Sequence, residues 1–245
     1  MAETQRQLVP VSLPSGWDTD EKKFDLAHEA MIEHMYRDGY VWFKQGSHNA
    51  AMRLKELLGE SIYVTHVKEN TQSKSLLLKK KSLAPHTDHH AVDFVLWYVH
   101  GHCEEGGETH LYPTKIIDHN KVRLMTIADR LECKEHKIFE GDPGIWPVLQ
   151  TIPTRAEKAY GPLTLYRGEY FGLWYYSFWL ANSTDKNTEK KFKLLQKRIE
   201  QAEPFRGHLK KGDIFIFDNR LNLHARTEYF DSKRHLERHW IKAVI

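Results

Sequence analysis

Two segments of the sequence carry side chains that could bind one metal ion. His86 and Asp88 lie two residues apart, shortly before the apolar run Phe94 to Val99. On an extended chain, residues two apart project to the same side, so an imidazole and a carboxylate would face the same ion. A third ligand, His224, follows an alternating apolar segment far along the chain. Two histidines and one carboxylate form the facial arrangement that leaves coordination positions of an iron(II) ion open for reaction.

Histidine is abundant in this chain, so the spacing alone leaves alternatives open. The sequence holds 16 histidines among 245 residues, and imidazole is the commonest metal ligand in proteins. Neighbouring histidines could replace His86 as a ligand or orient the ligands from behind. These neighbours are His89, His90, His100, His102 and His110.

The elements that must position these residues are short strands. Apolar and β-branched runs predict the strands Tyr40 to Phe43, Ile62 to Val67, Ser75 to Leu78, Phe94 to His100, Thr109 to Tyr112, Val148 to Ile152, Leu163 to Tyr166, Asp213 to Phe217 and Arg238 to Val244. After Asp213 to Phe217, a polar turn leads into a further strand that carries His224. Many strands without regular alternation of strand and helix favour a sandwich, barrel or jelly roll over a parallel sheet.

Helices are predicted at four places. A capping box of Asp18 and Glu21 opens the first helix, and Gly39 ends it. The other predicted helices are Asn49 to Leu58, Ile116 to Leu131 and Asn187 to Ala202. The fold class is therefore α+β, with flanking helices on a β core. We expect a single domain over residues 1–245, with residues 1–20 as an irregular leader.

Composition excludes several classes of protein. The formal net charge of +3 is too small and too evenly spread to indicate a nucleic-acid partner. The longest apolar run, Phe94 to Val99, is far shorter than the roughly 20 residues of a membrane helix. The N-terminal residues lack the apolar core of a secretory signal, and two cysteines fit a reducing compartment. We expect a cytoplasmic protein with no nucleic-acid or membrane partner; a homo-oligomer is left open.

Beyond the metal ligands, the order of the motifs resembles a known family. His86-Thr87-Asp88, the segment Glu104 to Thr109, the run Gly212-Asp213 through Asp218-Asn219, His224, and Arg234-x-x-x-Arg238 occur in the order seen in iron(II)- and 2-oxoglutarate-dependent dioxygenases. The taurine dioxygenase and clavaminate synthase-like group is the most similar. The resemblance covers roughly residues 25 to 245, including Arg37 to Val41, which looks like the family's entry strand.

This resemblance implies a fold, a set of cofactors and roles for particular residues. The fold is a double-stranded β-helix, or jelly roll, that holds iron(II) through His86, Asp88 and His224 as catalytic metal ligands. Thr109 and Arg234 match the residues that hold the distal carboxylate of 2-oxoglutarate. A guanidinium and a hydroxyl suit that role, because together they neutralise and orient a carboxylate.

The implied reaction consumes O2 and 2-oxoglutarate and releases succinate and carbon dioxide while a small-molecule substrate is hydroxylated. Arg238 matches an arginine that binds an acidic group of the primary substrate in several family members. Glu104 and Glu105, if they face inward, would suit an amine, which together with Arg238 suggests a free amino acid or a similar zwitterion. The aromatic run from Tyr170 to Trp179 could line the substrate pocket or pack as core.

Two rival classes remain at this stage. One is a jelly-roll metal protein with hydrolase or isomerase chemistry, which would need a metal but no 2-oxoglutarate. The other is a non-catalytic metal-binding module that kept the fold without turnover. Binding of 2-oxoglutarate separates the first rival from the dioxygenase, and formation of succinate separates the second.

Overall fold

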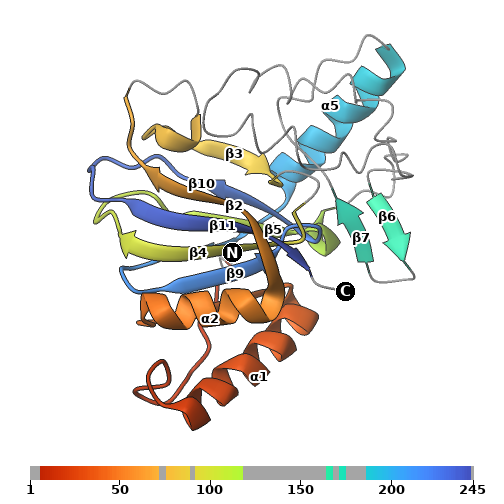
Figure 1. Ribbon diagram of the computed structural model, residues 1–245. Helices are drawn as coiled ribbons and strands as arrows, with labels where there is room; N and C mark the ends of the chain where they lie inside the picture. The colour runs from red at the N-terminus through yellow and green to blue at the C-terminus, as the bar shows by residue number, and fades with distance from the viewer. Residues whose placement is uncertain are drawn as a thin grey trace, which may run out of the picture.

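Two facing antiparallel sheets form the centre of the protein in a computed structural model (Figure 1). The structure describes residues 6–71, 76–88, 92–117, 164–167, 171–174 and 186–243. The five-stranded sheet consists, in spatial order, of β1 (Tyr40–Phe43), β9 (Ile214–Asp218), β4 (Phe94–Gly101), β11 (His235–Ala243) and β2 (Gly59–Lys68). The four-stranded sheet consists of β3 (Leu83–His86), β10 (Asn222–Arg226), β5 (Thr109–Pro113) and β8 (Phe205–Gly207). A separate pair joins β6 (Thr164–Arg167) and β7 (Phe171–Trp174).

The five-stranded sheet is buried on both faces, and strand β9 shows why. Phe215 and Phe217 point into the space between the two sheets, whereas Ile214 and Ile216 point to the other side. All five residues of β9 are buried, and the first four, Ile214 to Phe217, are all apolar because both faces of the strand are covered. The first face contributes to the core of the jelly roll, and the second packs against helices.

Helices α1 (Glu21–Asp38) and α2 (His48–Leu58) cover the outer face of this sheet (Figure 1). The predicted apolar stripe of α1 is buried at Phe24, Ala27 and Met31. Gly39 ends α1 in the left-handed conformation with φ of 76°, as its sequence position predicts. The predicted N-cap of α1 was wrong by two residues.

Asp20, and not Asp18, caps the N-terminus of α1. Its carboxylate accepts a hydrogen bond from the backbone N–H of Lys23. The Asp18 carboxylate instead accepts from the backbone N–H of Ser47, which is itself the N-cap of α2. Asp18 therefore ties the start of the second helix to the segment that leads into the first.

Most of the predicted elements are present, with small shifts at their ends. One strand prediction is wrong, because Leu76–Leu78 form a 3₁₀ helix, η1. Leu77 and Leu78 still reach the core from this turn, so an apolar run was mistaken for a strand. The helix α5 (Lys186–Gln201) matches its prediction and buries Leu195 and Ile199.

Other predictions lie partly or wholly outside the described residues. The predicted strand Val148 to Ile152 lies wholly outside them, and the predicted helix Ile116 to Leu131 lies mostly outside them. Ile116, the first residue of that predicted helix, is the last residue of the 3₁₀ helix η2 (Thr114–Ile116). The single-domain assignment stays a prediction. Among the helices that the structure describes, none is long and apolar enough to cross a membrane.

Candidate active site

Strand pairing brings the three predicted metal ligands together. In the antiparallel pair β3–β10, His86 and His224 are directly opposite each other, and their ring centroids lie 4.2 Å apart. Asp88 follows two residues after His86. One ligand atom from each of the three residues lies within 4.8 Å of the others. All three side chains are buried, so the structure assembles the predicted triad between the two sheets.

Each carboxylate oxygen of Asp88 and one ring nitrogen of His86 are held in place by neighbours. The Nδ1 atom of His86 lies 2.8 Å from the carbonyl oxygen of Ala84, which leaves Nε2 as the ligand atom. The Nη1 atom of Arg238 donates to Asp88 Oδ1 at 2.8 Å, and Trp240 Nε1 donates to Oδ2 at 2.8 Å. These donors come from β11 of the opposite sheet, so both sheets fix the position of Asp88.

His224 lies in an aromatic wall. The rings of Trp97 and Phe217 lie 5.5 Å and 5.0 Å from its ring centroid. Its Nε2 atom faces Asp88 Oδ1 at 3.9 Å. Its buried Nδ1 atom has no hydrogen-bond partner among the described residues.

The triad has the charge states that metal binding requires. Burial lowers the pKa of His86, and burial together with the neighbouring His86 lowers the pKa of His224 well below 6.5. Both imidazoles are therefore neutral and can offer a lone pair. Burial acts to raise the pKa of Asp88, but the charge of Arg238 and the hydrogen bond from Trp240 act against it, and the pKa is lowered, so the carboxylate is ionised.

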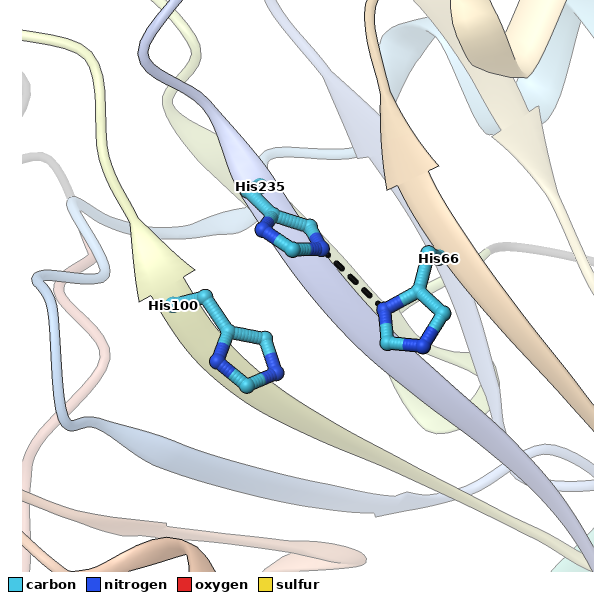
Figure 2. Close-up of side chains that lie close together, drawn as sticks. All are labelled: His66, His100 and His235. Carbon is cyan, nitrogen blue, oxygen red and sulfur yellow. Dashed lines mark hydrogen bonds between the residues drawn. The ribbon is translucent and has the colours of Figure 1, made fainter.

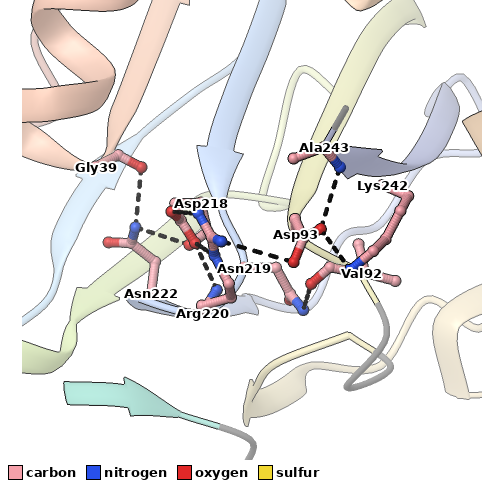
Figure 3. Close-up of polar contacts among 9 residues, drawn as sticks. All are labelled: Gly39, Val92, Asp93, Asp218, Asn219, Arg220, Asn222, Lys242 and Ala243. Carbon is pink, nitrogen blue, oxygen red and sulfur yellow. Dashed lines mark hydrogen bonds and ion pairs between the residues drawn. The ribbon is translucent and has the colours of Figure 1, made fainter. Parts of the chain in front are cut away.

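A buried asparagine positions the backbone of Asp88. The Oδ1 atom of Asn219 accepts the Asp88 backbone N–H at 2.7 Å, and Nδ2 donates to the carbonyl oxygen of Val92 at 3.1 Å. Figure 3 shows Asn219 within a polar network at the turn between β9 and β10. There Asp93 accepts from Lys242 at 2.9 Å and from the backbone N–H of Ala243 at 3.1 Å. Asn219 could be named from the sequence only as part of a family motif. Its role in holding Asp88 could not be predicted, because its hydrogen-bond partners are distant in the chain.

Arginines line the cavity beside the triad. A cavity between the sheets is lined by His224, Arg226, Arg234 and Arg238, together with apolar side chains. Arg234 is 7% exposed, and its Nη1 atom has no hydrogen-bond partner among the described residues. Burial, and then the charge of Arg226, lower the pKa of Arg234 to about 9. A buried guanidinium without a carboxylate partner is costly unless an anion binds there.

Thr109, the other predicted 2-oxoglutarate ligand, lines an adjoining cavity that also includes Arg234. Thr109 is buried at the first position of β5. Arg234 and Arg238 border the same inner cavity, as their four-residue spacing on a strand predicts. The structure thus brings together all six residues named from the sequence.

Arg226 differs from the other two arginines because both of its terminal guanidinium nitrogens donate to backbone carbonyl oxygens. It donates to the carbonyl oxygens of Leu77, Lys79 and Lys81 at 3.2, 2.6 and 2.7 Å. This arginine therefore holds the basic loop Lys79 to Lys81 in place and contributes a fixed positive charge to the cavity.

Several alternatives from the sequence are resolved. His110 lies 2.7 Å from the Glu108 carboxylate, and His100 lies on the other face of the five-stranded sheet. The condition on which Glu104 and Glu105 would suit a substrate amine is not met: both are exposed, and the Glu104 side chain is 71% exposed. His89, His90 and most of the aromatic run Tyr170 to Trp179 lie outside the described residues.

The donor set fits an iron(II) ion with 2-oxoglutarate beside it. Two neutral imidazoles and one ionised carboxylate form a facial set with room for further ligands. The adjacent cavity offers arginines and a hydroxyl, which match a dicarboxylate. The arrangement can bind a metal, orient an anion and exclude water from the space between the sheets.

Comparisons with known proteins support the same class. A jelly-roll oxygenase fold is shared with asparagine oxygenase, which is 12% identical over 89% of this chain and 79% of that chain, with a TM-score of 0.64. It is also shared with the non-heme iron oxygenase OrfP bound to iron, succinate and (3R,4R)-dihydroxy-L-Arg, which is 15% identical over 91% of this chain and 81% of that chain, with a TM-score of 0.65. The predicted jelly roll is therefore confirmed.

The sequence itself matches one family model. Residues 136–240 match the taurine catabolism dioxygenase TauD, TfdA family. No curated protein matches the chain. The predicted resemblance to the taurine dioxygenase and clavaminate synthase-like group is confirmed, and the class of enzyme that it implies is an iron(II)- and 2-oxoglutarate-dependent dioxygenase.

Proposed function

We propose that this protein is an iron(II)- and 2-oxoglutarate-dependent oxygenase that hydroxylates a free amino acid. The family match supports the class of reaction. Two proteins with the same fold support the class of substrate: asparagine oxygenase is described with 3-hydroxyasparagine and succinate, and OrfP with hydroxylated L-arginine. The products would be the hydroxylated amino acid, succinate and carbon dioxide.

One observation carries this proposal: a cavity beside the metal-ligand triad is also lined by an arginine that has no anionic partner among the described residues. His224 and Arg234 line this cavity, and His224 belongs to the triad with His86 and Asp88. The triad by itself does not account for a buried positive charge beside it. A co-substrate with a carboxylate at its far end accounts for both features.

Three groups of residues would have separate roles in this reaction. His86, Asp88 and His224 would hold the iron, and Arg234 with Thr109 would bind the distal carboxylate of 2-oxoglutarate. Iron with bound 2-oxoglutarate would supply the activation of O2. Trp97 and Phe217, packed against His224, would keep water away from the reacting atoms.

Arg238 supports binding of an acidic substrate. Its Nη1 atom donates to Asp88, but its buried Nε atom has no hydrogen-bond partner among the described residues. The three arginines that line the cavity carry three positive charges, and Asp88 beside them carries one negative charge. This excess of positive charge suits a dianionic co-substrate and the carboxylate of an amino acid at the same time.

The test is an anaerobic absorption titration of the metal-free protein with iron(II) and then 2-oxoglutarate. We expect the weak charge-transfer band that bidentate chelation of a 2-oxo acid to iron(II) produces, and its loss in His224→Ala. Amino acids can then be screened by the change that each causes in the band. Succinate release on admission of O2 would complete the test.

Two results would refute the proposal. Iron binding without the band would favour a metal hydrolase or isomerase, because such an enzyme has no 2-oxo acid ligand. The band without succinate would favour a binding module without turnover. The cytoplasmic location and the oligomeric state stay predictions.

A further inference from the structure

A second histidine cluster lies on the other face of the five-stranded sheet. Strand β11 alternates, so Arg238 and Trp240 face Asp88 between the sheets, whereas His235 and Glu237 face outward. The pairing of β11 with β2 places His66 directly opposite Glu237. The cluster is therefore distinct from the candidate active site, although it lies on the same strand.

A β-bulge adds the third imidazole. The pairing of β11 with β4 shifts between His235 and Leu236, and His100 is the extra residue of β4 at this shift. A bulge of this kind redirects a side chain. Here the His100 ring stacks on His235, with centroids 4.6 Å apart and an interplanar angle of 27°. Figure 2 shows the three imidazoles of His66, His100 and His235, one from each of three adjacent strands.

The spacing of the ring nitrogens matches that of metal ligands. His66 Nδ1 and His235 Nε2 lie 3.1 Å apart, and one ligand atom from each of the three histidines lies within 4.8 Å of the others. Two nitrogens bound to one tetrahedral zinc ion at about 2.0–2.1 Å would be about 3.3 Å apart. The ring nitrogens are thus close enough to bind a common ion once the side chains rotate to point their lone pairs at it.

A carboxylate holds the His100 ring in place. Glu237 Oε2 lies 2.9 Å from His100 Nε2, and the same carboxylate contacts His48 Nε2 at 3.1 Å and His239 Nε2 at 2.8 Å. Glu237 thus fixes the position of the His100 ring beside His235.

Two of the three imidazoles already share a hydrogen bond. His66 Nδ1 and His235 Nε2 are hydrogen-bonded to each other, so one of these nitrogens donates and the other accepts. An ion bound between the rings would take the place of this hydrogen bond. His66 is exposed and borders a surface groove with Lys68, Glu69 and Asn70, so an ion can reach the cluster from solvent.

We propose that His66, His100 and His235 form a second metal site, which binds a zinc(II) ion and ties β2, β4 and β11 together. Three imidazoles suit zinc, and the fourth position would hold water. His48, His100 and Glu237 form an overlapping set of ligand atoms. We favour the three histidines because Nε2 of His48 and Nε2 of His100 already face the Glu237 carboxylate. The proposal does not depend on the proposed oxygenase function.

The test measures zinc binding where the inner triad cannot contribute. In the variant His86→Ala/His224→Ala, isothermal titration calorimetry with zinc(II) should give one ion per chain at micromolar affinity or tighter. Adding His235→Ala should weaken binding by about 100-fold or more. The matched control is His48→Ala, which removes a neighbouring histidine that contacts Glu237 but is not a proposed ligand, and it should leave the affinity unchanged within a few-fold.

A second measurement tests the proposal even if the triple variant does not fold. In the otherwise wild-type chain, His235→Ala should reduce the zinc stoichiometry from two ions to one, with an unchanged circular dichroism spectrum. Cobalt(II) in the outer site should give the intense visible bands of tetrahedral coordination, and these should disappear in His66→Ala. The proposal is overturned if the inner-triad variant binds no zinc, if His66→Ala and His235→Ala leave binding intact, or if His48→Ala abolishes it.

Discussion

Replacing Arg234 should make the metal-free protein more stable and at the same time unable to bind 2-oxoglutarate. The guanidinium is buried, and its pKa is lowered from its ordinary value to about 9, first by burial and then by Arg226. At 1.36 kcal/mol per pKa unit, this difference corresponds to about 5 kcal/mol of unfavourable free energy for the charged form. The folded state binds this proton less tightly than the unfolded state, so the cost is full below pH 9 and declines as the pH rises above 9 toward the ordinary pKa of arginine.

Arg234→Met keeps the aliphatic length and removes the charge. Because an apolar replacement of a buried charge typically recovers part of such a cost, we expect the free energy of unfolding to rise by about 1–4 kcal/mol at pH 7. Urea denaturation of the metal-free protein measures this difference. The wild type should in addition gain about 2.7 kcal/mol from 2-oxoglutarate at 100 times its dissociation constant, measured with manganese(II) in place of iron. The variant should gain nothing.

Arg226→Met is the matched control, because Arg226 is as buried as Arg234 but is bonded to the backbone. Loss of its three hydrogen bonds to the carbonyl oxygens of Leu77, Lys79 and Lys81 should lower the stability by about 2–4 kcal/mol. The two substitutions thus have opposite predicted signs. If Arg234→Met also destabilises the protein, or if 2-oxoglutarate still stabilises that variant, Arg234 is a structural residue and the argument for an anion site is refuted.

Three further predictions concern the residues around the site. Asn219→Ala should weaken iron(II) binding by about 10–100-fold in a chelator competition, because the backbone N–H of Asp88 loses the amide oxygen that accepts its hydrogen bond. Unchanged affinity would show that Asp88 needs no such support. Burial raises the pKa of Asp213 above its ordinary value, so the folded state binds this proton more tightly and the carboxyl makes the protein less stable as the pH rises through its folded pKa. Asp213→Asn should remove that decrease in stability when urea denaturation is measured across this pH range. Gly106→Ala should lower the melting temperature, since φ is +74° and the new Cβ would lie 2.1 Å from the Glu228 carbonyl oxygen; a melting temperature equal to that of wild type would contradict the backbone geometry.

The sequence predicted those parts of the site that depend on the spacing of residues within one segment. His86 and Asp88 share a side of one extended segment, and Arg234 and Arg238 share a face by strand alternation. Their common location still depended on the family resemblance, because the pairing of His86 with His224 across β3 and β10 is a contact between residues 138 positions apart. Spacing within a segment specifies a face, whereas strand pairing decides which faces meet.

The errors have the same physical origin. Leu76 to Leu78 have the composition of a strand, but the backbone carbonyls just beyond them are bound by the guanidinium of Arg226, and the segment turns instead of pairing. Asp18 has the sequence of a helix cap, but its carboxylate binds the start of the other helix. In both cases a long-range hydrogen bond overrides a local preference, and no sequence window contains the partner.

The outer histidine cluster shows what the sequence could have indicated and what it could not. His235, Glu237 and His239 alternate with Leu236, Arg238 and Trp240, so one strand carries two polar patterns on opposite faces. The inner pattern could be predicted as part of a site because it matches a family motif, whereas the outer pattern matches none. Its third imidazole also comes from a β-bulge at His100, which strand periodicity does not predict. Since β11 carries both clusters, an ion bound at His235 would fix the strand that also positions Arg238 and Trp240 on Asp88.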